Sequence, residues 1–388
     1  MAALKFTRFL IFSLVFLLSP VLHAGTSLVS LPDRQDASIR LQDQGAALVQ
    51  EKRGLTLHKG INHIEFSRQN VMIDPASVIL APLTHPDRIT LLSVSEPPAG
   101  ASLVWEISSP EDLQEEVMIS YLLSGMDGIT AYQALADTKE SLLELQTYLV
   151  LRNFSGEAFE AVTAHTGLGS PFATAIRNLE TKKILVSRNP GVPIKKIHTW
   201  DARLMPHEPE KSQPGPGLPV SYELVNLKSS NLGTFDLRPG KIRLFQQDSR
   251  GGTVFLGEDT TGFTPVGDKT RLHIGDSRDI LVTRRRTESA KTNVRRNADG
   301  QVQVYDEDIK VELLMENLKD GPVNLSLIET LPGQWENIHF SLPYVQEDHQ
   351  TLVFTIDLPA GAKKTLTLNY KLLNIFAANF SEYNEIRD

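Results

Sequence analysis

The stretch VMISYLLSGMDG, residues 117–128, combines the two signals that dominate this chain. Residues 117–123 are mostly β-branched, aromatic or aliphatic, as in a buried strand, and residues 124–128 are rich in turn formers. We therefore expect a strand, a hairpin connection over 124–128 and a second strand from Ile129. The same succession of short apolar runs and turn clusters recurs along most of the chain, which predicts a mainly β protein with antiparallel β-sandwich-like domains and little helix.

Strict alternation supports this prediction upstream of the quoted stretch. In INHIEF, residues 61–66, a strand would place Ile64 and Phe66 on one face and His63 and Glu65 on the other. That pattern indicates a half-buried strand.

One segment is ambiguous, because its apolar residues fit either period. Leu142, Leu143, Leu145 and Leu149 can be placed on a helix, whereas the flanking residues look extended. We expect a strand here. Residues 149–166 and 311–330 share an order of strand, asparagine, short glycine turn and strand, which indicates two sandwich-like units.

The length of 388 residues exceeds the size at which one hydrophobic core stops growing, so two or more domains are expected. Composition shifts and proline density define their boundaries. The predicted parts are a signal peptide at 1–24, an N-terminal β domain at 25–112, a β-rich region at 117–190, a proline-rich linker or loop at 191–218, and a C-terminal β-sandwich at 219–388.

Residues 1–24 have the pattern of an export signal. Lys5 and Arg8 form a basic start, residues 9–21 are almost wholly apolar, and Ala24 supplies a small residue for cleavage. Cleavage is favoured over a membrane-spanning helix, because Pro20 interrupts the apolar run before it reaches the roughly 20 residues that spanning requires. We expect an exported protein, periplasmic or secreted, with no transmembrane helix after signal removal.

Charge and cysteine content exclude several classes of function. The formal net charge is −8, and removal of residues 1–24 would take away two more positive charges, so nucleic acid is not an expected partner. The chain has no cysteine, which excludes a thiol nucleophile and cysteine-based metal sites. No phosphate-binding loop or nucleophile elbow is present, and no cofactor is expected.

One basic run departs from the acidic balance. Arg284, Arg285 and Arg286 lie together among threonine, serine and asparagine residues. They are either the solvated end of a strand or a contact for an acidic envelope protein or a surface polymer.

Three carboxylates lie close together in the sequence, at Glu258, Asp259 and Asp268. Oxygen ligands of this kind suit a hard cation such as calcium, but the Asp-x-Asp-x-Asp loop is missing, and we expect no metal. Paired carboxylates also suit glycoside hydrolysis, if they lie about 5 to 10 Å apart in the fold.

Several segments resemble the bacterial family called domain of unknown function 4139. They are YELVN at 222–226, LRPGKIRLF at 237–245, LGED at 256–259, TPVGD at 264–268 and LHIG at 272–275. The resemblance extends over residues 117–372, and residues 48–80 are similar to the N-terminal domain that commonly precedes this family. Many members carry a long coiled coil between the two parts, for which residues 80–117 leave no room. The resemblance implies a β fold and an envelope location, and it implies no catalytic residue.

Two functions remain open at this point. The first is a non-enzymatic binding or assembly module of the bacterial cell envelope that uses sandwich loops or edge strands. The alternative is a glycan or peptide hydrolase that uses paired carboxylates such as Glu258 and Asp259 as acid and base.

Overall fold

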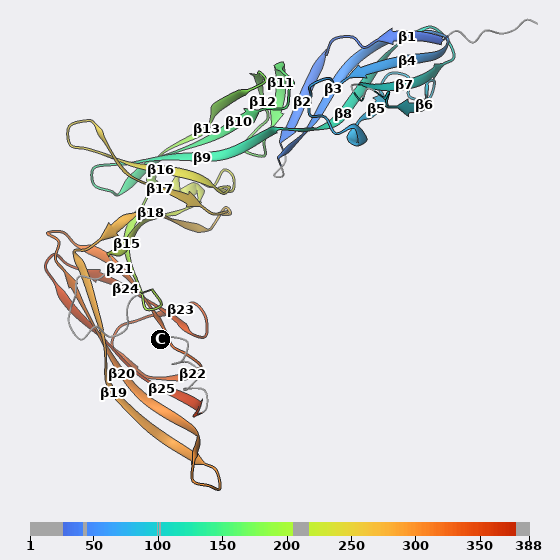
Figure 1. The fold of residues 1–388 in the computed structure, drawn as a ribbon. Coiled ribbons are helices and arrows are strands. Elements are labelled where there is room, and N and C mark those ends of the chain that lie inside the picture. The colour runs from blue at the N-terminus through green and yellow to red at the C-terminus, as the bar shows by residue number, and fades with distance from the viewer. Residues whose placement is uncertain (1–25, 42–44, 99, 101, 205–216, 378–388) are drawn as a thin grey trace, which may run out of the picture. The chain divides into compact units, whose positions relative to one another are not determined.

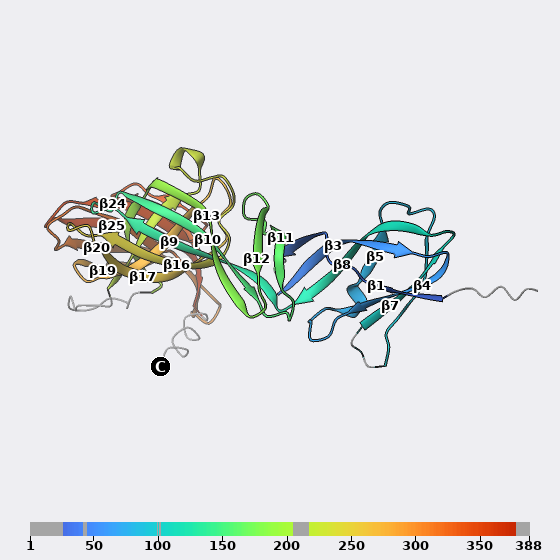
Figure 2. The ribbon, with the colours of Figure 1, turned by 90° about the horizontal axis from the view of Figure 1, so that it is seen from above.

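The computed structural model describes residues 26–41, 45–98, 100, 102–204 and 217–377, so the predicted export signal lies outside the described residues. Strands dominate this part of the chain, which confirms the mainly β prediction (Figure 1, Figure 2). Its helices are two single turns of 3-10 helix, η1 (Pro75–Ser77) and η2 (Lys228–Ser230). Within the described ranges, no helix is long and apolar enough to cross a membrane.

The described chain divides into two compact units. Unit 1 contains the residues up to Asp127 together with 152–166 and 171–180, and unit 2 contains 128–151, 167–170 and the residues from Thr181 onward. The predicted boundary after residue 112 therefore does not coincide with the edge of a compact unit, and the predicted region 117–190 is shared between the two.

Unit 1 is built from two sheets, which we name after a central strand of each. The β4 sheet has the order β1 (Thr26–Ser30), β4 (Gly60–Ser67), β7 (Ser102–Ser109), β6 (Thr90–Ser95). The β3 sheet has the order β12 (Phe172–Ile176), β11 (Phe159–His165), β2 (Asp36–Leu41), β3 (Ala46–Leu57), β8 (Leu113–Ser124), β5 (Ile79–Pro82).

The inner faces of these two sheets share an aromatic cluster. The ring of Phe66, on β4, lies 5.5 Å from that of Trp105 on β7 and 5.7 Å from that of Tyr121 on β8. All three side chains are buried, as is Ile64, whereas Glu65 is exposed. The alternation predicted for residues 61–66 is thus confirmed, and the burial of large aromatic side chains stabilises the sandwich.

Unit 2 contains three sheets. The β16 sheet has the order β13 (Glu180–Pro193), β10 (Leu142–Asn153), β9 (Met126–Ala136), β16 (Gly240–Gln247), β17 (Thr253–Thr261). The β21 sheet has the order β18 (Lys269–Ser277), β15 (Leu218–Val225), β14 (Lys195–Asp201), β21 (Val323–Thr330), β24 (Thr351–Leu358), β23 (Val345–Gln346). The β20 sheet has the order β19 (Ile280–Arg296), β20 (Val302–Asn317), β25 (Lys363–Phe376), β22 (Gln334–Phe340).

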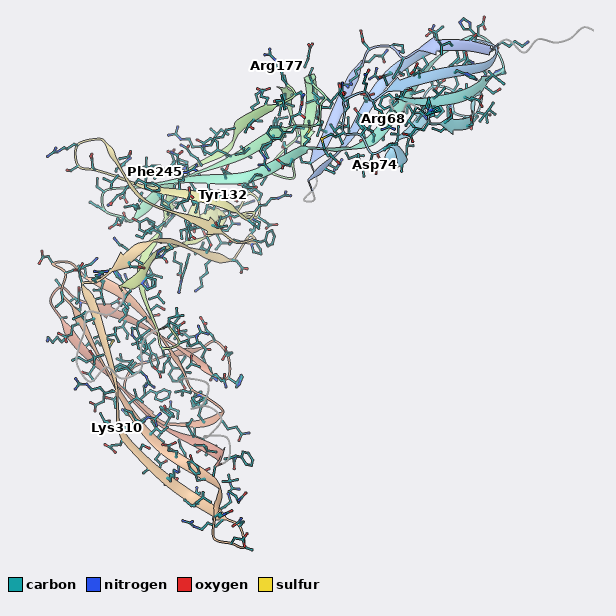
Figure 3. All side chains as sticks on the ribbon, viewed as in Figure 1. Arg68, Asp74, Tyr132, Arg177, Phe245 and Lys310 are labelled. Carbon is teal, nitrogen blue, oxygen red and sulfur yellow. The ribbon has the colours of Figure 1, made fainter. Side chains whose placement is uncertain are left out.

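The β21 sheet contributes to two hydrophobic cores. With the β20 sheet it buries Trp200, Leu325 and Phe354. With the β16 sheet it buries Tyr222 against Tyr132, a residue of β9 that is labelled in Figure 3. Unit 2 is therefore a pair of sandwiches that share one sheet, and the ambiguous leucine-rich segment is strand β10, as predicted.

The predicted hairpin over 124–128 is wrong. Strand β8 pairs in the β3 sheet, whereas β9 pairs in the β16 sheet. Gly125, with a φ of +77°, lies between them, and its carbonyl accepts a hydrogen bond from Phe154 N at 2.7 Å. The glycine therefore forms a corner at which the chain changes sheet.

The predicted linker over 191–218 is also wrong in its first part. Residues up to Pro193 belong to β13, and residues 195–201 form β14. Strand β13 is the outer strand of its sheet, where prolines are tolerated because no ladder hydrogen bond is lost. Residues 205–216 of the predicted linker lie outside the described residues.

Candidate functional site

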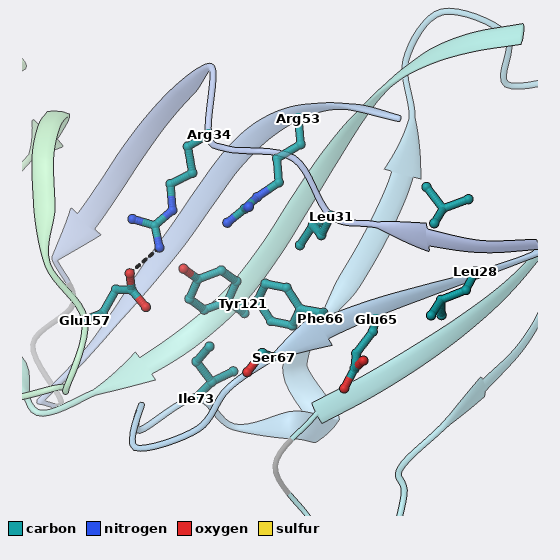
Figure 4. Close-up of a pocket in the computed structure, with 11 residues that line it drawn as sticks. Leu28, Leu31, Arg34, Arg53, Glu65, Phe66, Ser67, Ile73, Tyr121 and Glu157 are labelled. Carbon is teal, nitrogen blue, oxygen red and sulfur yellow. Dashed lines mark hydrogen bonds and ion pairs between the residues drawn. The ribbon is translucent and has the colours of Figure 1, made fainter. Parts of the chain in front are cut away.

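Unit 1 contains a cleft of about 570 Å³ beside the end of β1 (Figure 4). Its apolar wall consists of Leu28, Val29, Leu31, Phe66 and Ile73. Leu28 is 79% exposed, so this wall is open to solvent at its outer end.

The polar wall rests on a buried carboxylate. Glu51, on β3, is 0% exposed, and its Oε2 accepts a hydrogen bond from Arg34 Nε at 2.5 Å while its Oε1 accepts one from Arg53 Nε at 2.9 Å. A second bond of Arg34 goes to Glu157, drawn as a dashed line in Figure 4. A buried charge is tolerated only when it is paired, and here two guanidinium groups pair with one carboxylate. The network holds both arginines in place at the cleft.

Electrostatics keep Arg34 charged. Burial lowers the pKa of Arg34, but the carboxylate of Glu51 raises it, and the net result is a pKa above the ordinary value. The guanidinium also stacks on the ring of Phe159, with 4.9 Å between its central carbon and the ring centroid. Arg34 is therefore a permanent cation at the edge of the cleft.

The hydroxyl of Tyr121 forms no hydrogen bond with this ion-pair network. Its side chain is 1% exposed and lines the cleft, and its hydroxyl has no hydrogen-bond partner among the described residues. Figure 4 shows the hydroxyl directed toward the end of the cleft where Arg34 and Glu157 meet. Burial, followed by the negative charge of Glu51, raises the pKa of Tyr121, so the hydroxyl keeps its proton and is a hydrogen-bond donor. Most buried polar groups in native proteins are paired, and an unpaired one calls for an explanation.

The cleft lies beside the end of β4 with which β1 does not pair. β1 pairs with β4 in parallel from Thr26↔Ile61 to Ser30↔Glu65. β4 continues to Ser67, and the chain after β1 turns away to Arg34. Phe66 and Ser67 therefore extend beyond the paired length of β1, and both line the cleft.

The polar groups of the cleft are ion-paired side chains and hydrogen-bond donors. Two arginines are balanced by Glu51 and Glu157, and Glu65 lies at an exposed position on the rim. The described lining residues include one serine, Ser67, and no histidine. Across the described ranges, no group of three histidine, aspartate or glutamate side chains is placed to hold a metal ion. The cleft can donate hydrogen bonds and bury apolar surface.

The structure does not bring the three predicted carboxylates into one site. Glu258 lies on β17, where its oxygens accept from Lys241 Nζ at 2.5 Å and pair with Arg243 Nε at 3.0 Å. The hydrogen bond from Lys241 lowers the pKa of Glu258, which is opposite to what a general acid requires. Asp259 accepts from the backbone N–H of His273 at 2.7 Å, and Asp268 is exposed in the turn before β18.

The three predicted arginines have different surroundings. Arg284 Nη2 lies 2.8 Å from Oε1 of Glu329, a side chain that is 1% exposed, and Arg286 Nη1 lies 3.7 Å from Oε1 of Glu307. Arg285, between them on β19, is exposed. The three side chains therefore do not form a single exposed contact surface, because alternate residues of a strand point to opposite faces.

The sequence contains one signal for the cleft that the motif search missed. Ala47, Val49, Leu55 and Leu57 are inward positions of β3, and Glu51 lies on the same face, at 0% exposure. A carboxylate inside a period-2 apolar face predicts a buried charge that needs a cation. Arg34 and Tyr121, from other segments, carry no comparable signal.

A comparison with protein-family models finds no match for this chain, and a comparison with curated proteins finds none either. The resemblance of residues 117–372 to the domain of unknown function 4139 therefore stays a prediction.

Proposed function

We propose that this protein is a non-enzymatic binding module exported to the bacterial cell envelope, and that the cleft of unit 1 is its recognition site. The export pattern at 1–24 and the family resemblance support the location. The observation that carries the binding role is the cleft itself, with one apolar and one donor-rich wall. Sites that bind small molecules or peptide segments commonly combine these two surfaces.

The geometry favours binding over hydrolysis. Arg34 holds Glu157 in an ion pair, and the lysine and arginine contacts of Glu258 place that carboxylate in an exposed ion pair on β17. A glycosidase needs a carboxylic acid that keeps its proton near neutral pH. The hydrogen bond that lowers the pKa of Glu258 favours the opposite protonation state.

Site-specific photo-crosslinking in the cells that make the protein tests this proposal. A benzophenone amino acid replaces Leu28, which lines the cleft and is 79% exposed, and in a matched strain it replaces Leu204, which is 71% exposed and belongs to unit 2. We expect an adduct of defined mass from position 28 and none of that mass from position 204. Absence of an adduct at position 28, or the same adduct at both positions, would refute a binding role for the cleft.

A further inference from the structure

Three features of the cleft define the class of its ligand. We propose that it binds an extended peptide segment of a partner protein, which continues the line of β1 along β4 and accepts a hydrogen bond from the hydroxyl of Tyr121. This inference rests on the proposed function and specifies its ligand.

The first feature is the unpaired end of β4. Pairing with β1 stops at Ser30↔Glu65, whereas β4 runs on to Ser67. A strand edge offers backbone donors and acceptors at regular spacing, and an added segment can pair with it by strand addition. An extended segment that occupies this place lies in the cleft, because Phe66 and Ser67 line it.

The second feature is the hydroxyl of Tyr121. It is a neutral donor, it is buried, and it has no partner among the described residues. A main-chain carbonyl oxygen is a neutral acceptor that would satisfy it. The ion pair of Arg34 with Glu157 lies at this end of the cleft (Figure 4), and both side chains are more than 20% exposed, at 23% and 22%. Displacement of Glu157 alone would leave Arg34 paired with the buried Glu51, so an incoming carbonyl can reach the hydroxyl without leaving a buried charge unpaired.

The third feature is the charge of the site, which argues against an anionic ligand. Glu51 and Glu157 already neutralise Arg34 and Arg53, and Glu65 adds a negative charge on the rim. A ligand carboxylate or phosphate would add repulsion to this set. A peptide backbone brings acceptors without net charge.

The wall of the cleft favours a peptide over a sugar. The aromatic rings of the lining are those of Phe66 and Tyr121, at 3% and 1% exposure, so neither offers an open ring face for stacking. The accessible apolar wall is aliphatic, with Leu28 as its most exposed member. It suits an aliphatic side chain of the bound segment, because side chains of an added strand project out of the plane in which its backbone pairs.

A displayed library of random heptapeptides tests the inference on the chain from residue 25 onward. The library is selected on the immobilised protein and counter-selected on a Ser67→Trp variant, whose indole would fill the cleft beside the β4 edge. We expect enrichment of uncharged sequences with an aliphatic residue near the centre. The affinity of selected peptides is then measured by fluorescence anisotropy.

The decisive variant is Tyr121→Phe. It removes a hydroxyl that has no partner among the described residues, so the free energy of unfolding should stay the same or rise. Peptide affinity should fall about three- to tenfold, as for the loss of one neutral hydrogen bond. Tyr132→Phe is the matched control, because that hydroxyl donates to Arg238 O at 2.8 Å within unit 2. The control should lose stability and keep its peptide affinity.

The outcomes separate this inference from the proposed function. If no peptide is enriched, or if Tyr121→Phe binds the peptides as the unaltered chain does, the peptide inference is overturned. An adduct at position 28 together with either of these results would leave the cleft as a binding site for another class of ligand. The absence of both peptide binding and the adduct would overturn the two proposals together.

Discussion

Single buried side chains set much of the local geometry of this protein, and asparagine is the clearest case. Among the described residues, four asparagines are at most 1% exposed, and each bonds the backbone of a turn near a point where the chain passes from one sheet to another. They are Asn62, Asn153, Asn226 and Asn317. Their side-chain amides replace backbone hydrogen bonds that a sheet no longer supplies at these turns.

Asn153 and Asn317 each bond the backbone of the residues that lie two and four positions later in the chain. Oδ1 of Asn153 accepts from the N–H of Ser155 at 3.2 Å, and its Nδ2 donates to the carbonyl of Glu157 at 2.7 Å. Asn317 repeats both contacts, at 3.0 Å to Lys319 and 2.9 Å to Gly321. The similarity of residues 149–166 and 311–330 in the sequence thus corresponds to one shared turn geometry.

Asn153→Ala and Asn317→Ala should each lower the free energy of unfolding by about 2 to 4 kcal/mol, because several buried backbone groups lose their partner. Urea unfolding followed by far-UV circular dichroism measures the change. Asn337→Ala is the control: that side chain is exposed, and its amide lies 3.5 Å from Tyr344 Oη. An equal loss in the control would contradict the role given to the buried amides.

His198 predicts a dependence of stability on pH. Its side chain is 2% exposed, and neither ring nitrogen has a hydrogen-bond partner among the described residues. Burial, then the positive charges of Lys319 and Lys196, lowers the pKa of His198 to about 4 from 6.5. The folded state therefore holds the neutral ring, whereas the unfolded chain takes up a proton below about pH 6.5.

Unit 2 should accordingly lose stability as the pH falls from 6.5 to about 4, by roughly 3 kcal/mol in total, and the loss should level off below that pH. His198→Phe removes the titrating group and keeps an aromatic ring at this buried position. Denaturant unfolding at a series of pH values should show a smaller dependence over this window for the variant. Identical pH profiles for the two proteins would show that another group titrates.

At the scale of strands, one buried ion pair connects two sheets of unit 2. Arg284 on β19 donates to Glu329 on β21 from Nε to Oε1 at 3.1 Å, from Nη2 to Oε1 at 2.8 Å and from Nε to Oε2 at 3.3 Å, and their side chains are 13% and 1% exposed. A pair of this kind contributes little relative to apolar residues of the same volume, but loss of one partner leaves a buried charge unpaired. One arginine of the basic run, Arg284, thus has a structural role in this ion pair.

Arg284→Met should destabilise unit 2 by about 3 to 5 kcal/mol, because the buried carboxylate of Glu329 would lose its bonds to the guanidinium of Arg284. The double variant with Glu329→Leu should recover most of that loss. Chemical unfolding of both variants measures the difference between them. Arg285→Met is the matched control, since this neighbour is exposed, and its effect should stay within about 0.5 kcal/mol. A double variant no more stable than the single one would contradict the argument.

The positions of strands could be predicted from the sequence far better than the partners with which the strands pair. The period-2 pattern correctly located residues 61–66, and the extended character of the flanking residues correctly indicated the leucine-rich strand β10. The prediction of a hairpin at 124–128 was wrong, because the turn signal of Gly125 is the same for a reversal of the chain and for a corner between two sheets. Pro193 fell in the predicted linker because edge and central strands look alike until the pairing is known.

For the whole molecule, each unit has a hydrophobic core of its own. Leu55 and Leu325 are both 0% exposed, the first in unit 1 and the second between two sheets of unit 2. Hydrophobic burial on this scale stabilises each unit separately, which agrees with a chain too long for one core.

Leu55→Ala and Leu325→Ala should each cost about 3 kcal/mol through lost burial and a residual cavity. Hydrogen exchange with mass spectrometry on the chain from residue 25 onward should show faster exchange in the unit that carries the change and unaltered exchange in the other. Leu318→Ala, at a 59% exposed position, is the control and should leave exchange unchanged. Equal acceleration in both units after either core substitution would show that they unfold together.

The sequence by itself determined the fold class, the positions of many strands and the absence of thiol chemistry, because these follow from local periodicity, turn residues and composition. It also contained Glu51 as an acidic residue on the inward face of an apolar strand. Only the tertiary structure decided that Arg34 and Arg53 pair with that carboxylate, and that the hydroxyl of Tyr121 lies near the free end of β4 without a partner among the described residues. The physical reason is that a cleft depends on contacts between segments far apart in the chain, and no local pattern records which strands meet.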